Sequence, residues 1–175
     1  MVFIDDAELA LQAAVDLVNS SRPETLGSVA ALDEFFARFG YTGRHERTRA
    51  ELEAVRALRE PLRELLTAPR DDAVAIINEM LASANAVPQL VRHDPYDWHI
   101  HAVPLDAPLA TRILVETAMA MIDVIRLDET SRLGICDDST CEDLVLDLSR
   151  NRRKRYCSTT CANRNAVAAY RSRQR

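Results

Sequence analysis

The chain has 175 residues, of which 47% are hydrophobic and 28% charged, and its net charge is −5. This composition supports a hydrophobic core, and a mean hydropathy of −0.17 indicates a polar surface. The longest apolar run, residues 111–127, is interrupted by Glu116 and Asp123, which excludes a membrane span. Four glycines and 5% aromatic residues favour helices over a sheet-rich fold.

Helical periodicity covers the first part of the chain. Residues 7–19 carry apolar side chains at helical spacing. Ser28 is suited to cap a second helix, whose apolar face ends at Gly40. A longer helix is expected over residues 48–66, and Pro61 should kink or restart it.

Two aspartates should begin the next helix, because acidic side chains favour a helix N-terminus. They are Asp71 and Asp72, and the residues expected to be buried after them are Val74, Ile77, Met80 and Leu81. Beyond this helix the period changes to two, since Trp98, Ile100 and Ala102 alternate with His99 and His101. This alternation predicts a two-stranded hairpin with Trp98 and Ile100 in the core.

A long helix from Ala107 to about Arg132 follows, with Pro108 in its first turn. Its apolar residues are nearly continuous, so it is expected at the centre of the core. Gly134 marks a boundary. We therefore predict a mainly α protein with a helical body, residues 1–132, that includes the small β-hairpin. A compact module, residues 133–175, should be held against it by the short join.

Charge is distributed unevenly along the chain. All 27 acidic residues lie at or before Asp147, which leaves residues 1–148 with a net charge of −14. Residues 149–175 contain no acid and nine bases: Arg150, Arg152, Arg153, Lys154, Arg155, Arg164, Arg171, Arg173 and Arg175. A segment this basic favours a polyanionic partner. The alternative is that it docks on the acidic body.

The four cysteines form two short-spaced pairs, C-x4-C and C-x3-C, separated by fifteen residues: Cys136, Cys141, Cys157 and Cys161. The opening residues do not resemble a secretory signal, so a cytoplasmic location is expected, where cysteines stay reduced. Four thiolates suit one tetrahedral Zn²⁺ with no open position, which indicates a structural site. Ordinary buried thiols are the alternative, but these cysteines lie in polar contexts.

The segment between the two pairs is interpreted as strand, polar turn and strand, with Leu144 and Leu146 on one face. The turn is shaped by Asp147 and Ser149. The second pair lies at a helix start, where Ser158 is a candidate cap. Strands, turn and ligand-bearing helix are typical of a treble-clef-like zinc finger. A module this small needs the metal for its stability.

The helix after Cys157 should present a basic face, since Arg164, Arg171 and Arg175 recur at helical spacing. Val167 and Tyr170 occupy the neighbouring stripe and are expected to pack on the hairpin. The polar turn adds five candidate phosphate contacts: Arg150, Arg152, Arg153, Lys154 and Arg155. Two basic elements tied by a metal, with no compensating acid, favour nucleic-acid binding.

Residues from Cys136 to Arg171 resemble the CGNR-type zinc finger in their ligands, in the Asp147–Asn151 turn and in Asn163 and Arg164. The chain departs from the family pattern at Ala162, where glycine is usual. In that family the finger follows a helical domain described as a stress-induced transcription regulator, the ABATE domain, and "WHIHAV" and the first helix are similar to it. The resemblance implies a bacterial transcription regulator that binds DNA through its finger.

Three further residues are candidates for a ligand pocket. His99 and His101 share one strand face, as a metal or catalytic site would require, although the strand is also explained as core. Asn19 ends the first helix, where it either lines a pocket against the hairpin or serves as an ordinary helix-terminal Asn. No nucleophile arrangement of Ser–His–Asp or Cys–His type is found, so we expect no enzyme activity.

The sequence thus predicts a DNA-binding transcription regulator with one structural Zn²⁺. A single finger buries little surface, so a homodimer is expected to supply specificity. Two alternatives remain: the finger is an RNA- or protein-binding adaptor, or the helical body senses a small-molecule effector through the His99 and His101 face.

Overall fold

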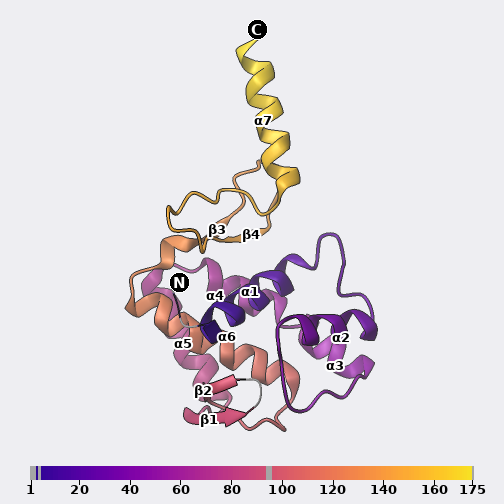
Figure 1. Cartoon of the computed structure of the whole chain (residues 1–175), viewed down its shortest axis with the longest axis vertical. Helices are drawn as coiled ribbons and strands as arrows, with labels where there is room; N and C mark the ends of the chain where they lie inside the picture. Colours follow the sequence, from indigo (N-terminus) through magenta and orange to yellow (C-terminus); the bar gives the residue numbers. More distant parts are fainter. Residues whose placement is uncertain (1–2, 4, 94–95, 175) are drawn as a thin grey trace.

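Residues 3, 5–93 and 96–174 are described by the computed structural model (Figure 1). The fold is mainly helical with two antiparallel hairpins, as predicted. In chain order its elements are α1 (Asp5–Asn19), α2 (Val29–Arg38), α3 (Arg49–Arg56), α4 (Arg59–Thr67), α5 (Arg70–Ser83), β1 (Gln89–His93), β2 (Tyr96–His101), α6 (Leu109–Arg126), a 3-10 turn (Thr130–Arg132), β3 (Leu133–Ile135), β4 (Leu144–Leu146) and α7 (Thr159–Arg173).

Side-chain caps define where the short helices begin. The Ser28 hydroxyl accepts a hydrogen bond from the Ala31 amide, which confirms the predicted cap of α2. Thr48 caps α3 in the same way. The helix expected over residues 48–66 is divided into α3 and α4, and Pro61 lies in the first turn of α4, where its missing N–H costs nothing.

Helix α6 forms the centre of the core, as predicted, and it packs against α1, α3 and α5. Its buried face includes Ile113, Ala118 and Met121. The helix ends at Arg126 instead of Arg132, and a 3-10 turn follows. Val74 of α5 was expected to be buried but is 39% exposed, because α5 turns Ala73, Ile77 and Met80 inward and Val74 lies beside that stripe.

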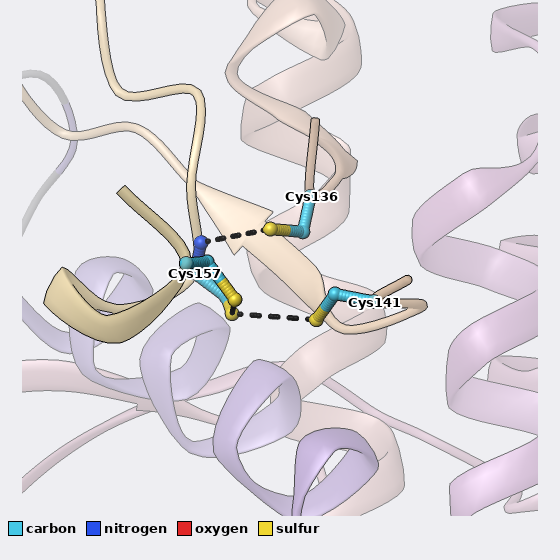
Figure 2. Close-up of side chains that lie close together, drawn as sticks. Cys136, Cys141 and Cys157 are labelled. Carbon is cyan, nitrogen blue, oxygen red and sulfur yellow. Dashed lines mark hydrogen bonds between the residues drawn. The ribbon is translucent and has the colours of Figure 1, made fainter. Parts of the chain in front are cut away.

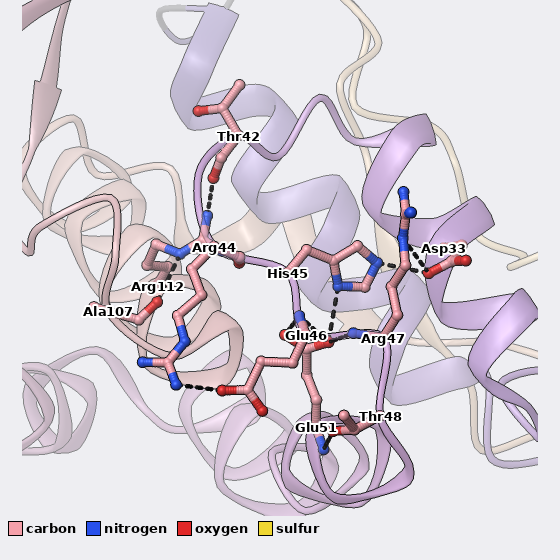
Figure 3. A network of polar contacts seen from close by, with 10 residues as sticks. All are labelled: Asp33, Thr42, Arg44, His45, Glu46, Arg47, Thr48, Glu51, Ala107 and Arg112. Carbon is pink, nitrogen blue, oxygen red and sulfur yellow. Dashed lines mark hydrogen bonds and ion pairs between the residues drawn. The ribbon is translucent and has the colours of Figure 1, made fainter.

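A buried arginine anchors the loop between α2 and α3 (Figure 3). Arg112 of α6 is 1% exposed and donates hydrogen bonds to the backbone oxygens of Thr42, Arg44 and Ala107. Gly43, at φ +84°, lies directly against the backbone of Leu105, so a side chain there would clash with the Leu105 carbonyl oxygen. The loop is therefore fixed against α6.

A histidine secures the other end of this loop. The His45 ring lies between the carboxylates of Asp33 (Nε2–Oδ1, 2.7 Å) and Glu51 (Nδ1–Oε2, 2.8 Å), as Figure 3 shows. It also stacks on Phe36, with ring centroids 4.4 Å apart. These contacts join α2, the loop and α3 into one unit.

The first hairpin pairs Leu90 with Ile100 and Val91 with His99. The alternation was predicted correctly, but the buried face was predicted wrongly: Trp98 is 65% exposed and Ile100 47%. The histidines occupy the inner face instead, toward α1 and α6. Among the described residues of this region, Ala102 and Val103 at the end of the hairpin enter a core cluster, where they pack with Val115 of α6.

The second hairpin, β3 with β4, lies against the helical body. Leu144 and Leu146 of β4 are buried in the same core as α1 and α6. The strand predicted after the polar turn is not formed, and β4 pairs instead with β3. The other edge of β4 faces α1, which leaves no room for a further strand. Helix α7 projects away from the body (Figure 1).

Candidate metal centre and nucleic-acid interface

Four cysteine thiols meet between the second hairpin and α7. Figure 2 shows three of them, Cys136, Cys141 and Cys157. Their sulfur atoms all lie within 4.8 Å of one another, and the Cys157 sulfur lies 3.6 Å from Cys141 and 3.7 Å from Cys161. A regular tetrahedron with Zn–S bonds of 2.3 Å has edges of about 3.8 Å. The arrangement fits one Zn²⁺ bound by Cys136, Cys141, Cys157 and Cys161.

Local structure places each thiol. Cys136 directly follows β3, and a tight turn brings Cys141 back toward it, because the Asp138 carboxylate accepts hydrogen bonds from the Thr140 amide and hydroxyl. Ser158 caps α7 by accepting from the Cys161 amide at 3.3 Å, as the sequence predicted. Cys157 and Cys161 therefore flank the start of a fixed helix.

The electrostatics of the cluster favour a cation. Burial raises the pKa of Cys141 to about 11 and that of Cys157 still further. Burial also opposes ionisation of Cys136, but backbone N–H donors from Cys157 and Asp138 outweigh it and lower the pKa of that thiol. Several thiolates this close together need a positive charge between them, and a bound zinc ion deprotonates its thiol ligands.

A second layer of polar contacts supports the thiols. Arg164 directs its Nε at the Asp138 carboxylate (3.1 Å) and its Nη2 at the Cys161 sulfur (3.6 Å). Asn165 donates to Asp138 at 2.8 Å and to the Cys161 carbonyl at 2.9 Å. Asp138 and Asn165 were missed by sequence reasoning, although the turn-forming sequence "CDDSTC" carried a signal for the aspartate.

The polar turn is organised by Asp147, as predicted. Its buried carboxylate accepts hydrogen bonds from the amides of Ser149 (2.8 Å) and Lys154 (2.7 Å). Arg132, which is also buried, donates to the carbonyl oxygens of Asp147 and Ser149. Both contacts tie the basic turn to the second hairpin.

The candidate nucleic-acid residues fall into two groups, and the expectation that no acid compensates them is wrong. Three arginines pair with acids outside the basic segment: Arg152 with Glu129, Arg155 with Asp137 and Arg164 with Asp138. The Lys154 ammonium group donates to the Leu146 carbonyl. Within the described residues, no acidic partner is found for Arg150, Arg153, Lys154, Arg171 and Arg173. Arg175 lies outside those residues.

Helix α7 is exposed on all sides beyond its first turns. Val167 is 48% exposed and Tyr170 59%, so the expectation that they pack on the hairpin is wrong. The hairpin's apolar face is turned into the body, and α7 leaves it at the zinc site. The exposed part of α7 thus carries an aromatic and an aliphatic side chain beside two arginines.

The three pocket candidates do not meet. His99 and His101 line a cavity between the first hairpin, α1 and α6. Asn19, at the end of α1, instead pairs with the backbone of Leu144 in β4: its Nδ2 donates to the carbonyl (2.9 Å) and its Oδ1 accepts from the amide (2.7 Å). Asn19 therefore joins the helical body to the second hairpin and does not line this cavity.

Among the described residues, no helix is long and apolar enough to cross a membrane. No curated protein matches the chain significantly. Residues 11–127 match the ABATE family, described as "Putative stress-induced transcription regulator". Residues 132–174 match the CGNR zinc finger family. The chain thus belongs to the ABATE family, and a CGNR zinc finger with one structural Zn²⁺ follows that domain.

Proposed function

We propose that this protein regulates transcription by binding duplex DNA, with α7 as the element that contacts the major groove. The observation that carries the proposal is the combination of exposure and charge in α7: the helix projects from the zinc centre and contains arginines but no acid. Fifteen helical residues extend about 22 Å. The major groove, about 12 Å wide, accepts such a helix.

The basic turn and the arginines of α7 both supply phosphate contacts in this proposal. Arg150 and Arg153 of the turn are exposed, as are Arg171 and Arg173 of α7. Arginine suits both surfaces, because its planar group binds phosphate or guanine through two hydrogen bonds. Arg164 has a different role, because it contacts Asp138 and the Cys161 sulfur and so stabilises the metal centre. It is therefore not one of the proposed DNA contacts.

Zinc acts structurally in this proposal. Its four thiolate ligands leave no open position for a substrate, so we infer that the centre has no catalytic activity. Reduced thiols also favour a cytoplasmic location. One helix and one turn contact only a short stretch of DNA. We therefore predict that the protein binds as a homodimer, and analytical ultracentrifugation tests this.

The test measures binding of the zinc-loaded full chain to a fluorescent random-sequence duplex at 50 and 200 mM salt. If about five basic residues neutralise phosphates, the affinity should fall roughly 500-fold between these concentrations. Arg171→Gln with Arg173→Gln should reduce the slope of log affinity against log salt by about 1.8. Arg49→Gln, which changes an arginine exposed on α3, is the matched control and should leave the slope unchanged.

Selection of bound sequences from the same pool then tests specificity. Enrichment of one motif by the wild type, and not by Cys157→Ala, supports DNA recognition through the finger. Absence of duplex binding at 50 mM salt, or tighter binding to single-stranded RNA than to the duplex, would contradict the proposal and favour the adaptor alternative.

A further inference from the structure

A cavity of about 270 Å³ lies in the helical body, well away from the zinc centre. Its walls come from the N-terminal half of α1, the C-terminal two thirds of α6, the end of the first hairpin and the loop that Arg112 anchors. At about 30 Å³ per water, it has room for roughly nine waters. A compact organic molecule fits this volume.

The charged residues that line the cavity are mostly acidic. Asp6 of α1 and Glu116 and Asp123 of α6 line it together with one arginine, Arg126, which is exposed. The rest of the wall is largely apolar and includes Leu9, Phe39 and Met119. A ligand that matches this lining has a positive group and an apolar body.

The two histidines of the wall contact each other and the backbone. His99 Nδ1 lies 2.7 Å from the Asp97 carbonyl oxygen, which can only accept, so this nitrogen donates. The Nε2 atoms of His99 and His101 lie 2.8 Å apart, so one of them donates to the other.

An unpartnered hydroxyl is a separate sign of a polar ligand. Tyr41 lines the cavity and is 8% exposed, and its hydroxyl is the one buried side-chain polar atom without a hydrogen-bond partner among the described residues. Burial, together with the charge of Glu116, raises the pKa of Tyr41 well above its usual value, so the hydroxyl keeps its proton. Such groups usually find a partner in native proteins.

We propose that this cavity is a binding site for a small organic amine, with the ammonium group beside the carboxylates of Asp6 and Glu116 and the apolar body against α1 and α6. The site lies in the helical body, mostly within residues 11–127, which match the ABATE family, and it does not depend on the proposed DNA binding. It gives the domain the means to sense a ligand.

The charge state of Glu116 makes the proposal testable by pH. Burial raises the pKa of Glu116 to about 7; the Arg112 charge works against this, and the nearby Asp6 carboxylate adds to it. An ammonium group prefers the ionised carboxylate, so its affinity should rise as pH increases through 7. From pH 6 to 8 the ionised fraction grows about tenfold. The His99–His101 pair and the Tyr41 hydroxyl also line this cavity, so a variant at position 116 must isolate the effect.

The experiment uses the zinc-loaded full chain and isothermal titration calorimetry with 2-phenylethylamine. Two probes that keep the phenylethyl group serve as comparisons: neutral 2-phenylethanol, which has the same size as the amine, and anionic 3-phenylpropanoate, which is slightly larger. We expect the amine to bind at least tenfold more tightly than either, and its affinity to rise about tenfold from pH 6 to 8.

Glu116→Gln should weaken the amine at pH 8 by about tenfold or more, abolish its pH dependence and leave the alcohol unaffected. Asp6→Asn changes an exposed residue that does not endanger the fold, and should weaken the amine less. Glu79→Gln, on the exposed surface of α5, should change nothing. Equal or weaker binding of the amine relative to the alcohol or the carboxylate, no amine binding at millimolar concentration, or an unchanged affinity in Glu116→Gln would overturn the proposal.

Discussion

The contact between Asn19 and Leu144 should contribute substantially to stability. Leu144 pairs with Ile135 across the hairpin, but its own amide and carbonyl point to α1, where the Asn19 side chain takes the place of a neighbouring strand. Leu144 is 2% exposed, so water cannot replace the lost partners in Asn19→Ala. Asn19→Ala loses two hydrogen bonds and leaves two buried backbone groups without partners. This should lower the free energy of unfolding by about 2–4 kcal/mol.

For a chain of this size, that loss corresponds to a fall in Tm of roughly 5–15 °C. Urea unfolding of the zinc-loaded protein, followed by circular dichroism, measures the free energy directly. Asn78→Ala, on the exposed face of α5, is the matched control and should be neutral or slightly stabilising, because alanine is the better helix former. If Asn19→Ala is as stable as Asn78→Ala, the side chain does not hold the hairpin to the body and the reasoning fails.

Four further outcomes are expected. Chelation of zinc should abolish the helical signal of α7, 15 residues, while the helical body stays folded. Arg164→Gln should lower zinc affinity about 10- to 100-fold in a competition assay with a chromogenic chelator, whereas Arg171→Gln should not change it. Burial raises the pKa of Glu116 to about 7, so ionisation of this carboxyl group destabilises the folded protein. Glu116→Gln should therefore become more stable than the wild type as pH rises from about 4.5. The difference in the free energy of urea unfolding should reach a constant value of about 3 kcal/mol above pH 7. Trp98→Ala should cost less than about 1 kcal/mol by the same method, because the ring is exposed; a loss near 3 kcal/mol would mean that it is buried.

Features that depend on neighbouring residues could be predicted from the sequence. Ser28 and Ser158 cap helices because a cap needs only the amide three residues ahead. Asp147 organises its turn for the same local reason. The zinc ligands were also recognisable, because two short-spaced cysteine pairs in one segment meet when that segment folds on itself.

Partners distant in the sequence could not be predicted in this way. The alternation of residues 98–102 defines two strand faces, but it does not determine which face packs against the helical body. Trp98 was predicted to lie on the buried face, whereas it is exposed. Arg164 has the spacing of a DNA contact, yet Asp138 across the metal centre turns it inward. Asn19 has its partner 125 residues away, in a strand that its own helix flanks.

The sequence by itself determined the helical body, the zinc centre and the separation of charge, because each follows from residue spacing or from composition along the chain. Only the tertiary structure decided which arginines remain available to a polyanion and where a ligand cavity lies. Both depend on which surfaces are buried when distant elements pack. Acids from outside the basic segment pair with three of its arginines, and the fixed loop and the first hairpin line the cavity together with α1 and α6.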